Sequence, residues 1–92
     1  MSRKEIINKL EKDLAALGGK LNPLIDDPRR FIITYQHRFN PIWYIRDFDS
    51  LPELKSYLSD QRLTIGASYI IMDLDINREI KCNWIPSLEY IR

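Results

Sequence analysis

The first part of the chain repeats its apolar side chains every three to four residues, as an amphipathic helix does. This pattern predicts a helix over residues 2–17. Ser2 and Glu5 have the spacing of a capping box, in which the hydroxyl and the carboxylate each accept from a backbone amide near the helix start. Gly18 and Gly19 should end the helix, because glycine tolerates the left-handed conformation that closes it. The apolar stripe consists of Ile6, Ile7, Leu10, Leu14 and Leu17.

A second helical pattern lies in the middle of the chain and predicts a helix over residues 50–60. Ser50 and Glu53 repeat the capping-box spacing, and Pro52 suits a first helical turn. The apolar stripe of this helix is Leu51, Leu54 and Leu58.

Four other segments are rich in β-branched and aromatic residues, as strands are. We expect strands at residues 31–37, 42–48, 68–74 and 79–85. The second of these carries large side chains on both parities, which is typical of a strand buried on both faces.

The expected element order is α-β-β-α-β-β, in one small α+β domain spanning residues 1–92. It predicts a four-stranded, largely antiparallel sheet with both helices on one face. A circularly permuted ferredoxin-like fold would show this order, with its strands arranged 3-4-2-1 and a right-handed crossover helix. A simple meander carrying two helices is the alternative.

With both helices on one face, the other face of the sheet would be open to a partner. The side chains expected beneath the helices are Ile33, Trp43, Ile70, Met72, Cys82 and Trp84. Those expected on the open face are Thr34, Gln36, Arg38, Tyr44, Arg46, Tyr69, Ile71, Asp73, Lys81 and Asn83.

The composition disfavours some classes of protein but does not indicate an activity. The chain has 92 residues, 45% of them hydrophobic, and a net charge of +1, which favours neither a general nucleic-acid binder nor a membrane-surface protein. The single cysteine, Cys82, cannot form an internal disulfide, and no apolar run reaches the length of a membrane span. We therefore expect a soluble cytoplasmic protein.

The near-neutral total hides a separation of charge. Residues 29–46 contain four arginines and no acid, and aromatic residues lie among them. Arginine with aromatic residues is the composition enriched at binding hot spots. The leading hypothesis is a small non-catalytic interaction protein that binds a protein partner or a second copy of itself. Its expected partner-binding residues are Arg38, Tyr44, Arg46, Tyr69 and Trp43.

The alternative is a nucleic-acid-binding protein, in which the same segment neutralises phosphates and stacks on bases. Core aromatics and a solvated arginine rim would explain the composition equally well. The residues this alternative would use are Arg29, Arg30, Arg38, Arg46 and Tyr35.

No catalytic residues, metal site or cofactor are predicted. Asp73, Asp75 and Asn77 open like a calcium loop, but the glycine and glutamate that such a loop requires are missing. Cys82 alternates with apolar residues and is expected to be an inert core thiol rather than the partner of His37. An enzyme would have to combine acid–base groups that the sequence gives no reason to bring together. They are His37, Asp47, Asp49, Asp73 and Asp75.

Overall fold

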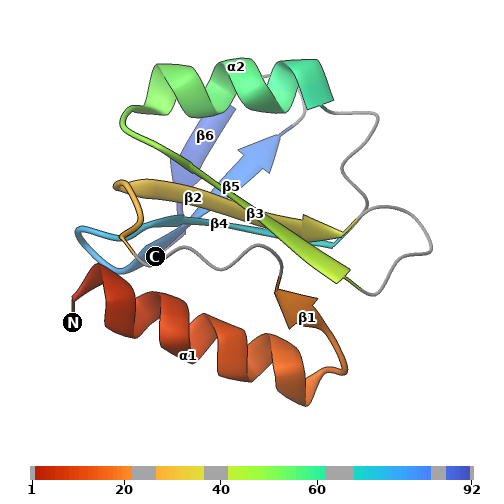
Figure 1. Cartoon of the computed structure of the whole chain (residues 1–92). Coiled ribbons are helices and arrows are strands. Elements are labelled where there is room, and N and C mark those ends of the chain that lie inside the picture. The colour runs from red at the N-terminus through yellow and green to blue at the C-terminus, as the bar shows by residue number, and fades with distance from the viewer. Residues whose placement is uncertain (1, 22–26, 37–41, 62–67, 84–86, 92) are drawn as a thin grey trace.

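The computed structural model describes residues 2–21, 27–36, 42–61, 68–83 and 87–91. They form one α+β domain, as predicted, with five antiparallel strands and a short parallel strand at one edge (Figure 1). The elements are α1 (Arg3–Ala16), β1 (Lys20–Leu21), β2 (Phe31–Gln36), β3 (Ile42–Phe48), α2 (Leu51–Gln61), β4 (Tyr69–Asp73), β5 (Arg78–Asn83) and β6 (Ser87–Tyr90). Their order across the sheet is β1-β3-β2-β4-β5-β6.

Both helices begin where their capping residues predict. The Ser2 hydroxyl accepts from the Glu5 amide at 3.2 Å, and the Ser50 hydroxyl accepts from the Glu53 amide at 3.4 Å. The Glu53 carboxylate reaches back to the Asp49 amide, at 3.1 Å. Gly18 adopts a φ of +81° after the last turn of α1, so the predicted glycine stop is confirmed.

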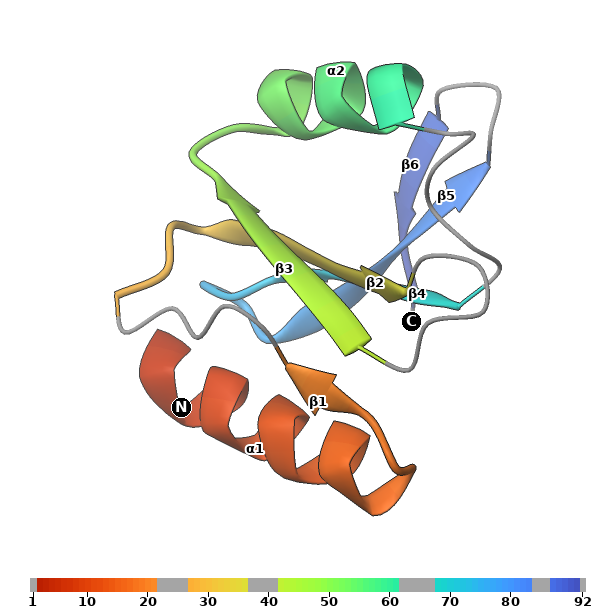
Figure 2. The ribbon, with the colours of Figure 1, turned by 45° about the vertical axis from the view of Figure 1, so that its right-hand side comes forward.

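The strand order differs from the 3-4-2-1 arrangement considered from the sequence. β2 lies in the middle of the sheet and pairs antiparallel with both β3 and β4. Two short segments join the four expected strands: β1 pairs parallel with β3, and β6 pairs antiparallel with β5. The sheet is strongly twisted, so that β3 crosses β2 at an angle in Figure 2.

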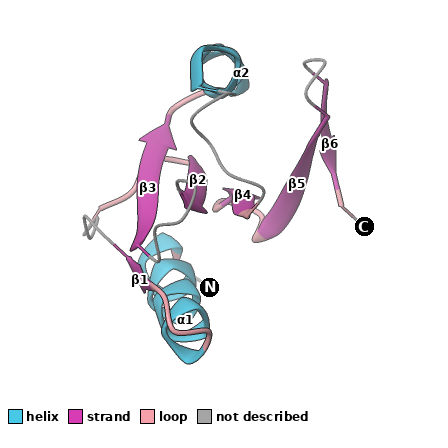
Figure 3. Ribbon diagram, turned by 90° about the vertical axis from the view of Figure 1, so that its right-hand side faces the viewer, coloured by secondary structure: helices cyan, strands magenta, loops and turns pink. Residues whose placement is uncertain are grey.

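The expectation that both helices cover one face of the sheet is wrong. α1 and α2 lie on opposite sides of it, which Figure 3 shows along the strands. The cause is visible in β2, where five consecutive residues, Phe31 to Tyr35, are buried. Because side chains alternate between faces along a strand, a fully buried strand needs cover on both sides.

Each helix has its own core layer. On the α1 face, the helix packs against Leu21, Ile32, Trp43, Ile45 and Leu74. On the α2 face, Leu54 and Leu58 of the helix pack with Phe31, Ile33, Tyr35, Ile71, Ile80 and Cys82.

The expected division of side chains between the two faces is also wrong. Ile33 pairs with Arg46 on one side and Ile71 on the other, so these three share the α2 face. Trp43, Ile70 and Met72, which were grouped with Ile33, lie on the α1 face instead. Trp84 and Arg38 lie outside the described residues.

Candidate partner-binding surface

Three of the expected partner-binding residues share the α2 face of the sheet. Tyr44 and Tyr69 are half-buried there, and Arg46 is exposed. Trp43 is on the opposite face and only 7% exposed, because α1 covers it. An added Cβ at Gly19 would collide with the Trp43 indole, so the close approach of the α1–β1 turn buries this ring. Trp43 is therefore a core residue rather than part of the surface.

The strand register places three tyrosines side by side. Tyr35 of β2 pairs with Tyr44 of β3 and with Tyr69 of β4, so the three rings start from adjacent strands at the same level. The Tyr35 and Tyr44 ring centroids are 5.8 Å apart. Tyr57 of α2 lies over Tyr35, with their hydroxyl oxygens 2.7 Å apart. We call Tyr35, Tyr44, Tyr57 and Tyr69 the tyrosine cluster.

Tyr69 has a structural role within this cluster. The β4–β5 ladder runs only from Asp73↔Arg78 to Ile71↔Ile80, after which β5 diverges from β4. The Tyr69 hydroxyl donates to the Cys82 carbonyl at 3.0 Å, and so supplies a hydrogen bond where the ladder has ended. The Cys82 thiol is buried, and burial raises its pKa, which agrees with the expected inert cysteine.

Arg46 is the exposed cation beside the cluster. Burial and the hydrogen bond with Tyr35 raise the pKa of Tyr57 to about 12, and the positive charge of nearby Arg46 opposes this rise. Within the described part of the chain, Arg46 forms no ion pair. Tyr44, Arg46 and Tyr57 thus combine aromatic surface with a positive charge that no described carboxylate pairs with. We call these three residues the β3–α2 surface.

Arg29 and Arg30, two of the arginines predicted for nucleic-acid binding, are engaged by carboxylates. The Arg29 guanidinium contacts Asp47 at 3.3 Å and Asp49 at 3.2 Å, and its backbone amide donates to Asp47. These hydrogen bonds raise the pKa of Arg29. Asp47 and Asp49, considered as acid–base groups, therefore act here as ion-pair partners.

Asp73 organises the neighbouring ion-pair network and was missed as a structural residue. Its carboxylate is 0% exposed and accepts from Arg30 Nε at 3.1 Å and Arg30 Nη2 at 2.9 Å. It also accepts from the Tyr90 hydroxyl at 2.8 Å and the Asp75 amide at 3.1 Å. Burial alone would raise the pKa of Asp73, but the hydrogen bonds from Arg30 and Tyr90 lower it.

This network also connects α1 to the sheet. Arg3 contacts Asp75 at 2.6 Å and donates to the Pro28 carbonyl at 3.2 Å, while Asp75 lies 3.6 Å from Arg30. We call Arg3, Arg30, Asp73, Asp75 and Tyr90 the Asp73 network. The only sequence signal for it was the apolar environment of Asp73 in a strand, since a buried carboxylate needs a partner.

A cation site at Asp73 and Asp75 is disfavoured, because two guanidinium groups already contact these carboxylates. Among the described residues, no three of the His, Cys, Asp and Glu side chains lie together as metal ligands would. His37 lies outside the described residues. Of the helices that the structure describes, neither has the length and apolar character needed to cross a membrane.

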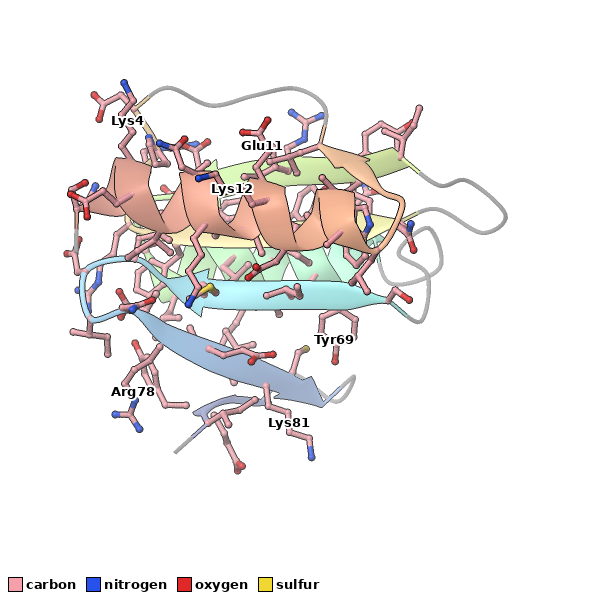
Figure 4. The ribbon with its side chains drawn as sticks, turned by 90° about the horizontal axis from the view of Figure 1, so that it is seen from below. Lys4, Glu11, Lys12, Tyr69, Arg78 and Lys81 are labelled. Atoms are coloured by element: carbon pink, nitrogen blue, oxygen red, sulfur yellow. The ribbon has the colours of Figure 1, made fainter. Side chains whose placement is uncertain are left out.

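The other surface feature is a shallow hollow of about 300 Å³ on the solvent side of α1. It is lined by residues on one face of the helix, namely Asn8, Glu11, Lys12 and Ala15. Figure 4 shows Glu11 and Lys12 on this face. None of the residues expected to bind a partner contributes to it.

Comparison of the chain with models of protein families, with curated proteins and with solved structures found no match. Function must therefore be argued from the residues themselves.

Proposed function

We propose that this chain is a non-catalytic protein-interaction module that binds an acidic patch of a partner protein through the β3–α2 surface. The observation that carries the proposal is the contrast among the arginines. Arg29 and Arg30 are neutralised within the fold, whereas Arg46 is exposed beside two tyrosines with no ion pair to any described residue.

The chemistry of the surface supports a protein partner. Tyrosine and arginine are the residues enriched at binding hot spots, and a guanidinium pairs well with a carboxylate across an interface. Tyr57 is held by its hydrogen bond to Tyr35 and by the Phe48 ring, whose centroid lies 5.3 Å away. A surface ordered in advance loses less conformational entropy when it binds.

The proposed mode of binding differs from docking on an open sheet face. Because helices lie on both sides of the sheet, the partner would contact the margin between β3 and α2 rather than a bare sheet. Tyr44 and Arg46 remain the expected anchors, and Tyr57 replaces Trp43 and Tyr69 in the set.

The test is a double substitution, Tyr44→Ala with Arg46→Ala, beside the matched control Lys81→Ala, which removes an exposed cation elsewhere. We expect the wild-type chain and the control to retain a common partner from a lysate of the source cells, and the double variant to lose it. Far-UV circular dichroism should show all three folded. Retention of the same partner by the folded double variant would contradict the proposal.

The nucleic-acid hypothesis stays a prediction, with less support. The carboxylate and carbonyl contacts of Arg29 and Arg30 leave these cations poorly placed to neutralise phosphates. Titration with a labelled single-stranded oligonucleotide at two salt concentrations separates the two functions. Binding that weakens steeply with salt would favour nucleic acid, since neutralised phosphates release counterions.

A further inference from the structure

The outer edge of β6 is a second feature that could bind a partner. β6 is the last strand in the sheet order, and Figure 3 shows it at the margin far from β1. Among the described residues, no strand pairs with its outer side. An edge strand presents a row of unpaired backbone groups, which an added extended segment can use.

The register of β6 shows which backbone groups point outward. The Ile91 amide donates to the Glu79 carbonyl at 2.9 Å, so these two residues form a hydrogen-bonded pair. Hydrogen-bonded and non-hydrogen-bonded pairs alternate along an antiparallel ladder. The backbone groups of Glu89 therefore face those of Lys81 as the next hydrogen-bonded pair. The backbone groups of Leu88 and Tyr90 therefore point away from β5.

The side chains of β6 differ on its two faces. Leu88 and Tyr90 lie on the α2 face, half-buried against its core layer. Glu89 is exposed on the opposite face, where its cross-strand neighbour is Lys81. Figure 4 shows Lys81 extending from β5 beyond the area that α1 covers, and both Lys81 and Glu89 are exposed.

We infer that the β6 edge binds an extended segment of another protein with an apolar–basic–apolar pattern. Residues opposite Leu88 and Tyr90 would point to the apolar side, and the residue between them would lie opposite Glu89. Opposite charges directly across a strand pair stabilise it, and like charges destabilise it.

A second copy of this chain fits the edge less well in the register that pairs both outward-pointing residues. Pairing Leu88 of each copy with Tyr90 of the other would bring the two outward-pointing stretches together. That register sets Glu89 opposite Glu89, where the side chains are close and the charges repel. A separate segment with a basic residue at that position avoids this repulsion.

The experiment is a titration of the ¹⁵N-labelled chain with two capped peptides, Thr-Val-Lys-Val-Thr and Thr-Val-Glu-Val-Thr. We expect the lysine peptide to shift the amides of Leu88, Glu89 and Tyr90, and to bind roughly fivefold tighter than the glutamate peptide. In the surface variant Glu89→Lys this preference should reverse.

A proline pair tests the backbone register. Leu88→Pro removes an outward amide and keeps the β5–β6 ladder, so it should fold and bind the lysine peptide roughly tenfold more weakly. Glu89→Pro removes an inward amide and should lower the urea midpoint instead.

Shifts confined to other residues, equal binding of both peptides, or no binding by the folded wild-type chain would overturn the inference. A dimer seen by light scattering, and abolished by Leu88→Pro, would also overturn it and assign the edge to a second copy. This inference does not depend on the β3–α2 surface, because Tyr44→Ala with Arg46→Ala should leave peptide binding unchanged.

Discussion

The two ends of β2 have different surroundings, with ion pairs at one end and the tyrosine cluster toward the other. At its start, Arg29 and Arg30 contact carboxylates from β3, β4 and the segments that follow them. Toward its other end, Tyr35 lies within the tyrosine cluster. Arg46, which lies opposite Ile33 in the middle of β2, has no ion pair in the described structure. Arginine composition alone therefore does not identify a binding surface. The pairing of each guanidinium separates structural cations from available ones.

A substitution at Asp73 measures how much the ion pairs at the start of β2 contribute to the stability of the fold. Asp73→Ala would leave the Arg30 guanidinium, the Tyr90 hydroxyl and the Asp75 amide without their acceptor. We expect it to lower the free energy of unfolding by about 3 kcal/mol, since Asp73 is buried and its loss leaves three donor groups without their charged acceptor. Urea unfolding measures the change. A loss no larger than that of Tyr57→Phe would contradict the contrast between the two ends.

The same carboxylate should make stability depend on acid pH. The pKa of folded Asp73 lies below its ordinary value of 3.8. Its contribution to stability is therefore present above that value, and it is lost as the pH falls through the folded pKa. We expect the urea midpoint to fall more steeply below about pH 4 in the wild-type chain than in Asp73→Asn. Parallel curves for the two proteins would rule out this role.

Tyr57→Phe measures the contribution of the tyrosine cluster to stability, for comparison with Asp73→Ala. It removes the 2.7 Å hydroxyl contact with Tyr35 and keeps the ring against Phe48. We expect a loss of about 1 kcal/mol in the free energy of unfolding.

The ionisation of Tyr57 gives a second measurement. Its pKa of about 12 lies above the ordinary 10.0, so its contribution to stability is present below pH 10.0 and lost as the pH rises toward 12. Tyrosinate absorbance should show a component titrating near pH 12 that disappears in Tyr57→Phe. Persistence of that component in the variant would assign it to another tyrosine.

The smallest effect is expected at Arg29. Its contacts with Asp47 and Asp49 are at the surface, and the Asp49 side chain is 68% exposed. Because exposed ion pairs contribute little to stability, Arg29→Ala should leave the urea midpoint nearly unchanged. A large loss would show that the ion pairs at this end act as a unit with the Asp73 network.

The sequence by itself determined the local features of this protein. The two capping boxes placed the helix starts, the glycine pair placed the end of α1, and segments rich in β-branched and aromatic residues located four of the strands. These features depend on residues a few positions apart, whose preferences act within a single element. The α+β class followed from the same signals.

Only the tertiary structure decided which faces and partners those residues have. Periodicity shows that Ile33 and Thr34 point in opposite directions, but it does not show whether Ile33 shares a face with Trp43 or with Arg46. The strand register decides this, because a shift of one residue moves every side chain to the other face. The burial of Asp73, the row of three tyrosines and the absence of a described carboxylate beside Arg46 all follow from pairings between distant segments, which a local pattern does not encode.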